Sequence, residues 1–128
     1  MMRDLARSSI VHVAVAFLAM GGWAFLANRA HAFPQPLVAG LVQGALSGAI
    51  TLVLKRMTET IAARLTGIAA LVLPPLIAVA LSLAFPTTIH TLAGTPELLA
   101  TIMLPVGVIA LYSTLYAAAL WRHKVSHG

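Results

Sequence analysis

Polar side chains that could do chemistry inside a membrane are concentrated in one apolar segment, residues 36–54. Gln43, Ser47 and Thr51 recur there at intervals of four residues. Because an α-helix turns by about 100° per residue, the three lie on one helical face. An unpaired amide in hydrocarbon costs several kcal/mol, so we expect Gln43 to bond to Ser, Thr, Tyr or a backbone carbonyl. This face predicts hydrogen bonds between helices or a polar path across the membrane.

A row of glycines runs beside these polar residues in an uninterrupted G-x-x-x-G-x-x-x-G pattern. Together the two rows cover about 140° of the helix surface and comprise Gly40, Gln43, Gly44, Ser47, Gly48 and Thr51. Small residues let helix backbones approach closely in lipid. The pattern is compatible with packing inside a helical bundle, a seam between copies of the chain, or the lining of a transport path. The opposite side is expected to face lipid and carries Val38, Val42, Leu46, Ala49, Ile50 and Val53.

His12 is the one histidine inside the apolar segments. An imidazole there could relay protons or bind haem or a metal ion. A metal or haem site would need a second ligand at the same depth, whereas His31 and His90 are expected on the opposite side of the membrane and His123 and His127 in the C-terminal tail. We therefore expect His12 to be a neutral side chain bonded to a neighbour, with a proton or polar site as the alternative.

The acidic residues Asp4, Glu59 and Glu97 all lie outside the apolar segments. Proton- and ion-coupled carriers usually keep an ionisable residue inside the membrane. Glu59 follows Lys55 and Arg56 at helical spacing and can pair with either. The chain has no cysteine, no serine with a nearby base and acid, no paired carboxylates and no phosphate-binding glycine loop. We expect no catalytic residue, no cofactor and no metal.

Most of the chain consists of four long apolar segments, which contain or flank these residues. A bilayer core of ~30 Å needs about 20 helical residues, and none of the segments contains Asp, Glu, Lys or Arg. With 60% hydrophobic and 9% charged residues, the chain is predicted to be an all-α membrane protein. It forms one four-helix transmembrane domain over residues 1–128, with the second helix at its centre. The predicted spans are residues 8–27, 36–54, 65–85 and 98–121, and the connection Pro86–Thr95 is expected to lie against the membrane surface.

Orientation follows from the positions of the basic residues. Seven of the eight Lys and Arg residues flank the segments on the side of the two termini, and only Arg29 lies on the other side. The positive-inside rule then places both termini in the cytoplasm. The net charge of +5 does not indicate nucleic-acid binding, because the basic residues sit at segment ends rather than on one face of a soluble domain.

The first segment also has features of a signal peptide. Arg3 and Arg7 precede the apolar run, and Ala30-His31-Ala32 has the A-x-A form of a cleavage site. The run is longer than the usual 7–15 residues, and Arg29 immediately precedes the site. We expect the segment to be retained as a span, with cleavage as the alternative.

In size and number of spans the chain resembles the small multidrug-resistance exporters and the GtrA-like four-span proteins. The membrane-embedded glutamate of the former is absent, and no motif of the latter is matched, so no family is assigned. The favoured interpretation is a non-enzymatic protein of the bacterial inner membrane. It would act through helix–helix association, as a homo-oligomer or as a small subunit of a larger membrane complex, in contact with membrane lipids. The alternative is a small transporter or lipid-type flippase with its path along the second helix.

Overall fold

The computed structural model of the chain consists of four long α-helices. It describes the backbone of residues 2–127 and the side chains of residues 8–126. Met1 and Gly128, the ends of the predicted domain, lie outside the described residues, as do the side chains of Arg3, Asp4 and Arg7 that entered the charge analysis. The helices are α1 (Met2–Ala27), α2 (Gln35–Arg64), α3 (Ile68–Ala93) and α4 (Leu98–His127).

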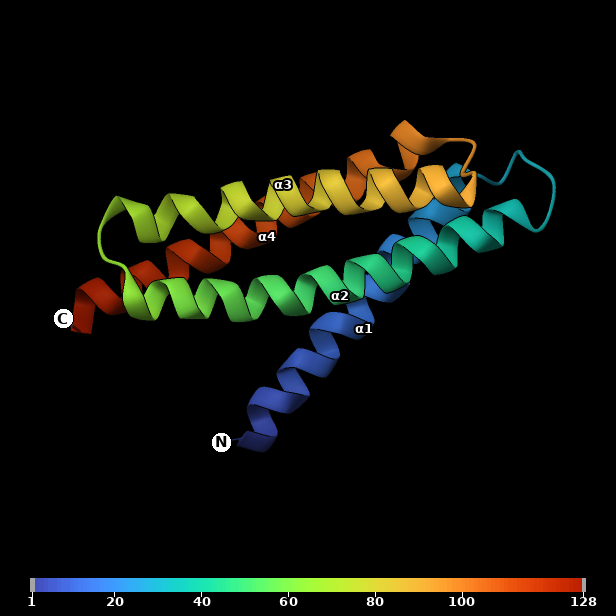
Figure 1. The fold of residues 1–128 in the computed structure, drawn as a ribbon. Coiled ribbons are helices and arrows are strands. Elements are labelled where there is room, and N and C mark those ends of the chain that lie inside the picture. The colour runs from blue at the N-terminus through green and yellow to red at the C-terminus, as the bar shows by residue number, and fades with distance from the viewer. Residues whose placement is uncertain (1, 128) are drawn as a thin grey trace.

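Each of the four helices is long and apolar enough to cross a membrane, as predicted. Helix α1 ends at Ala27, as expected, but begins at Met2, before the predicted span. The chain runs up and down, so that both ends and the α2–α3 connection lie at one end of the bundle and the other two connections lie at the opposite end (Figure 1). Helix α2 contacts all three other helices, whereas α1 and α3 do not touch.

Helix α3 extends farther than the sequence indicated. The prediction of a surface loop over Pro86–Thr95 is wrong, because the helix continues through Pro86 to Ala93. The helix is capped by Gly94, which has a left-handed conformation with φ 72°. A proline removes only one helical hydrogen bond. Ending the helix at that point would instead leave several backbone groups unpaired in an apolar environment. At its other end α3 begins at Ile68, three residues later than expected.

The apolar core lies where α2, α3 and α4 meet. It contains Ile50, Leu54, Ala78 and Ile109. The prediction that Ile50 faces lipid is wrong, since only 9% of its surface is exposed. The prediction assumes that α2 packs against other helices on one side only. A helix in contact with three others has a narrower lipid-facing surface. Of the predicted lipid-facing residues, those that the structure leaves exposed are Val38, Ala49 and Val53.

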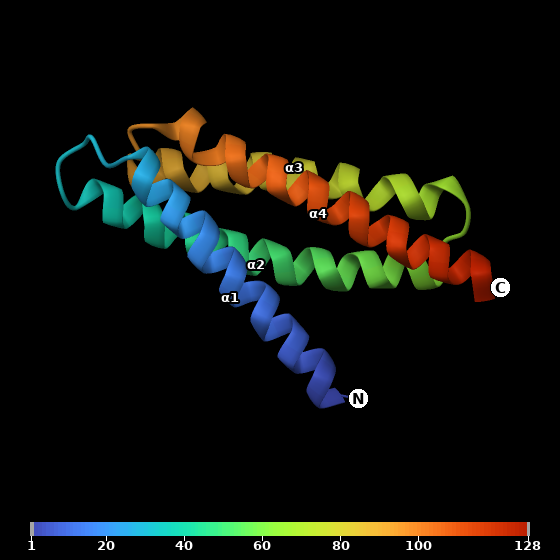
Figure 2. The ribbon, with the colours of Figure 1, turned by 180° about the vertical axis from the view of Figure 1, so that it is seen from behind.

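Helix α1 is fastened at one end and diverges at the other. Figure 2 shows its N-terminal half leaving the bundle. At the opposite end, the fully buried Asn28 donates from Nδ2 to Thr101 Oγ1 at 2.7 Å and accepts the Glu97 backbone N–H at 3.0 Å. Trp23 Nε1 donates to the carbonyl of Ala100 at 2.9 Å. These bonds tie the C-terminal end of α1 to the start of α4.

Candidate functional site

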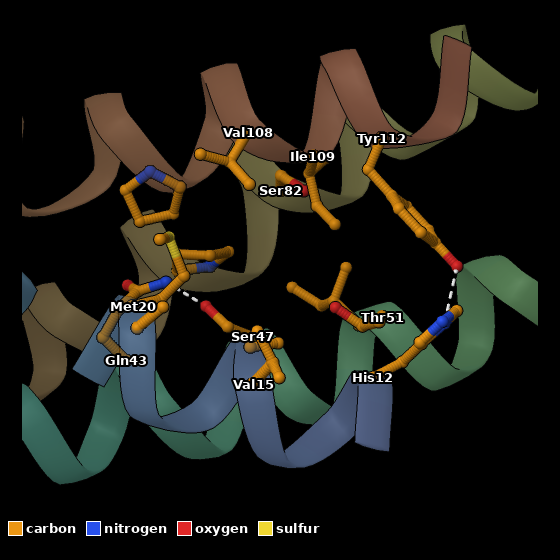
Figure 3. A pocket seen from close by; sticks show the side chains of 15 residues that line it. His12, Val15, Met20, Gln43, Ser47, Thr51, Ser82, Val108, Ile109 and Tyr112 are labelled. Atoms are coloured by element: carbon orange, nitrogen blue, oxygen red, sulfur yellow. Dashed lines mark hydrogen bonds between the residues drawn. The ribbon is translucent and has the colours of Figure 1, made fainter. Parts of the chain in front are cut away.

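A cavity of about 310 Å³ lies near the middle of the bundle, between α1 and α2 on one side and α3 and α4 on the other (Figure 3). Its walls are mostly apolar, with polar groups at a few positions. A site of this kind, concave and apolar with a few polar anchors, is typical of small-molecule binding. The lining residues are His12, Val15, Ala16, Ala19, Met20, Gln43, Ser47, Ile50, Thr51, Ser82, Pro86, Pro105, Val108, Ile109 and Tyr112.

The mouth of the cavity lies between α1 and α4. Val15 on α1 and Val108 on α4 both line the cavity, and they are 59% and 41% exposed. Lining residues that are also exposed mark the rim of the opening. In a membrane this rim meets lipid, because both residues belong to the apolar spans. An apolar molecule dissolved in the bilayer therefore has a direct route into the cavity.

The cavity-lining Gln43 forms a hydrogen bond between α2 and α3, which we call the His90 bridge. Gln43 donates from Nε2 to Ser47 Oγ at 2.8 Å, and its Oε1 lies 2.8 Å from His90 Nε2. The amide oxygen can only accept, so His90 Nε2–H is the donor. In the neutral imidazole, Nδ1 then accepts from the Thr95 hydroxyl at 2.7 Å. The buried Gln43 and His90 side chains thus satisfy one another.

One end of the cavity is bounded by a contact between α1 and α4, the His12 bridge. Tyr112 Oη lies 3.3 Å from His12 Nδ1 in a long hydrogen bond, and the two rings meet edge to face at 5.9 Å (Figure 3). Tyr112 stacks on Tyr116, whose hydroxyl donates to Glu59 Oε1 at 2.9 Å. Lys55 donates to the same oxygen at 2.7 Å, so the expected ion pair of Glu59 forms with Lys55. A polar chain therefore leads from this bridge to the end of the bundle that carries the termini.

The glycine row of α2, defined as Gly40, Gly44 and Gly48, faces α1 instead of the cavity. A Cβ on Gly40 would lie 3.0 Å from the carbonyl oxygen of Gly21, and one on Gly44 would lie 3.0 Å from that of Phe17. On Gly48 the nearest atom would be Val13 Cγ1 at 3.1 Å. At Gly40 and Gly44 the neighbour is backbone, which cannot move aside as easily as a side chain, so these two positions favour glycine. The row serves packing inside the chain, which occupies the surface that a seam between copies would need.

The six residues singled out on the second helix therefore separate into two groups. The glycine row packs against α1, while Gln43, Ser47 and Thr51, which we call the polar row, line the cavity. His12 also lines the cavity, at its far end. The structure thus brings the polar row and His12 to one site and leaves the glycines outside it.

Ser82, which lines the cavity, and His90, which bonds to the lining residue Gln43, were not identified from the sequence. His90 was assigned to a loop because Pro86 was read as the end of a helix. The recurrence of Ser82, Pro86 and His90 at intervals of four is the signal that could have placed all three on one face. The buried hydroxyl of Ser82 has no hydrogen-bond partner and lies on the cavity wall.

Within the described part of the chain, no group of three or more His, Asp or Glu side chains is placed to hold a metal ion. Comparisons with known proteins found no matching family model, no matching characterised protein and no matching solved structure.

Proposed function

We propose that the protein is a small membrane transporter that moves a mostly apolar molecule through the central cavity. The observation that carries this proposal is the position of the cavity between two polar bridges, each joining a different pair of helices. The His12 bridge joins α1 to α4, and the His90 bridge joins α2 to α3. This is the alternative that the sequence left open, with the path along the polar row.

Each bridge is weak enough to serve as a gate. A neutral hydrogen bond contributes about 0.5–1.5 kcal/mol net, and thermal motion opens contacts of this strength readily. Parting of the His12 bridge would move the divergent half of α1 away from α4 and open the cavity toward the termini. Parting of the His90 bridge would open it toward the other side. The glycine row and the Asn28 contacts would hold the part of α1 that follows His12 in place during either movement.

The sidedness of these gates follows from the distribution of basic residues. We place the protein in a bacterial inner membrane with both termini cytoplasmic, so the His12 bridge is the cytoplasmic gate. A reporter that works only in the cytoplasm should be active when fused after Gly128 or within residues 55–64. A reporter that works only in the periplasm should be active when fused beside Arg29. A C-terminal reporter active only in the periplasm would reverse the assignment of the gates.

The transport proposal can be tested without knowing the substrate, because the chain contains no cysteine. A Thr51→Cys variant places one thiol on the cavity wall. In proteoliposomes, a membrane-impermeant maleimide should label this thiol when added from either side, because a transporter exposes its central site to both sides in turn. Labelling is read as a mass increase of the intact chain.

The matched control is Val53→Cys, two residues away on the same helix, whose side chain is 54% exposed on the lipid-facing side. It should resist the same reagent from both sides. If Thr51→Cys is labelled from one side only, or from neither, the cavity does not alternate and the transport proposal is rejected.

Association with another membrane chain is the second candidate function. The observation that favours it is a groove of about 950 Å³ between the divergent half of α1 and the end of α2. Ile10 and Leu18 on its rim are strongly exposed, and a helix of a second copy or of another subunit would cover them. Light scattering in mild detergent tests the homo-oligomer. A particle containing one chain would exclude it.

A further inference from the structure

We propose that the cavity takes a small neutral molecule with an apolar body and one hydroxyl group, an alcohol or phenol, and that Ser82 is the anchor for that hydroxyl. This inference deepens the proposed function and rests on it, since it names the class of molecule that the same cavity would carry.

The Ser82 hydroxyl is a polar group without a partner in an apolar wall. The residue is 3% exposed, and its Oγ forms no hydrogen bond within the described chain. Buried hydroxyls in proteins nearly always have a partner, and other serines and threonines of the bundle illustrate this. Ser113, for example, is equally buried and donates to the carbonyl of Ile109 at 2.7 Å. Ser82 therefore has donor and acceptor capacity to offer to a bound molecule.

A second unsatisfied group belongs to the same residue. Pro86 lies inside α3, four residues after Ser82, and proline has no N–H to donate to the carbonyl of the residue four positions earlier. The Ser82 carbonyl therefore lacks its usual helical donor. Both Ser82 and Pro86 line the cavity. A hydroxyl can donate to one group and accept from another, so a ligand hydroxyl can bond to the unpartnered Ser82 Oγ and can also donate to a carbonyl that lacks its helical N–H.

The charge of the walls excludes an ionic ligand. Among the described residues that line the cavity there is no Asp, Glu, Lys or Arg. A cation inside the membrane needs a carboxylate partner, and Glu59 is already engaged by Lys55 and Tyr116. A carboxylate ligand would find no Lys or Arg on these walls, and their one basic side chain, His12, lies at the end of the cavity in contact with Tyr112. The ligand that fits these walls is neutral.

Water is a poor occupant for the same cavity. By volume it would hold about ten waters at ~30 Å³ each, and each buried water usually makes about three hydrogen bonds. The few polar groups on the walls cannot supply that number. A volume of about 310 Å³ lies at the lower end of the range for ligand pockets, which limits the ligand to a small molecule.

The test uses a diazirine-bearing octanol as a photoreactive probe on the full-length protein in lipid nanodiscs. Labelled peptides are identified by mass spectrometry. We expect labelling of cavity-lining residues such as Met20 and Ile109, reduced by excess octanol and not by octyl methyl ether, which cannot donate. Ser82→Ala should lower this labelling about tenfold, while Ser113→Ala, which removes a buried serine outside the cavity, should leave it unchanged. Ser82→Ala breaks no hydrogen bond within the described chain, so it should fold normally, and its melting temperature checks this.

Three results would overturn the proposal: equal labelling in Ser82→Ala, equal competition by the methyl ether, or no labelling of the cavity wall. The last would mean that water alone satisfies Ser82. None of these depends on the accessibility of Thr51→Cys. If that thiol is labelled from both sides while the octanol probe fails, transport stands and the ligand class is wrong. If the probe binds at Ser82 and the thiol is inaccessible, the ligand class stands and the cavity is a static binding site.

Discussion

The two rows of α2 lie side by side on one helix and serve different purposes. The glycine row brings α1 within contact distance along about two and a half turns, from Val13 to Gly21. The polar row is directed to the cavity and bonds to His90 and within itself. Both rows have a four-residue spacing. A four-residue spacing thus predicts that residues share a helical face. Whether that face packs against another helix or lines a cavity depends on the arrangement of the neighbouring helices.

The difference also separates stability from function within one helix. Backbone contacts at the glycine row are dense and leave no room for change, which suits a fixed support. The polar row borders a space that another molecule can enter, and its hydrogen bonds can be exchanged. The effects of substitutions in the two rows on stability should therefore differ both in magnitude and in physical cause.

The largest effect is expected from Gly44→Leu. A Cβ at this position would already lie 3.0 Å from the Phe17 carbonyl oxygen and 3.2 Å from the Phe17 ring, so a leucine would force α1 and α2 apart. Overpacking of this kind costs about 1–3 kcal/mol, and the helices would also lose dispersion contacts. The free energy of unfolding, measured by denaturant titration in mild detergent, should fall by that amount.

Gly22→Leu is the matched control, because nothing lies within 4 Å of a Cβ built on Gly22. Replacing a helical glycine there removes a backbone entropy cost of about 0.8–1.0 kcal/mol relative to alanine, so stability should stay the same or rise. A Gly22→Leu variant as unstable as Gly44→Leu would show that the close approach of α1 and α2 has been assigned to the wrong face.

An intermediate effect is expected from Gln43→Leu in the polar row. The substitution fits the space but leaves the buried His90 Nε2–H without its acceptor, a loss that costs about 1–3 kcal/mol. In the same measurement, the free energy of unfolding should decrease by less than it does in Gly44→Leu. Here the cause is an unsatisfied partner instead of steric overlap.

The double variant Gln43→Leu/His90→Leu distinguishes these causes. Replacing both partners by apolar groups can be nearly neutral, so the double variant should be more stable than the sum of the two single losses predicts. Simple additivity would mean that the two side chains are not energetically coupled, and the His90 bridge could not then act as a gate.

The sequence was sufficient to predict the four helices, but it could not predict which residues of each helix face the other helices. Apolar length and the absence of charge define a span locally, so the number of helices and the end of α1 at Ala27 could be predicted. The lipid-facing assignment of Ile50 failed because it depends on how many helices surround α2. Ser82 and His90 were missed for a related reason. A helix continues through Pro86 only because its surroundings penalise unpaired backbone groups, and that information is not local.

The smallest effect is expected from Leu41→Ala, on the lipid-facing surface between the two ends of the glycine row. Leu41 is 54% exposed and lies about 100° from Gly40 around the helix axis, just outside the arc that the two rows cover. It is a better control than Leu46, which is half-buried in the structure. Lipid tails replace the contacts that the shortened side chain loses, so the free energy of unfolding should change by less than about 0.5 kcal/mol. A loss as large as that of Gly44→Leu would mean that protein, not lipid, covers this side of α2. Together with a particle mass of more than one chain, that result would favour association over transport and would make the outer surface of α2, instead of the cavity, the functional site.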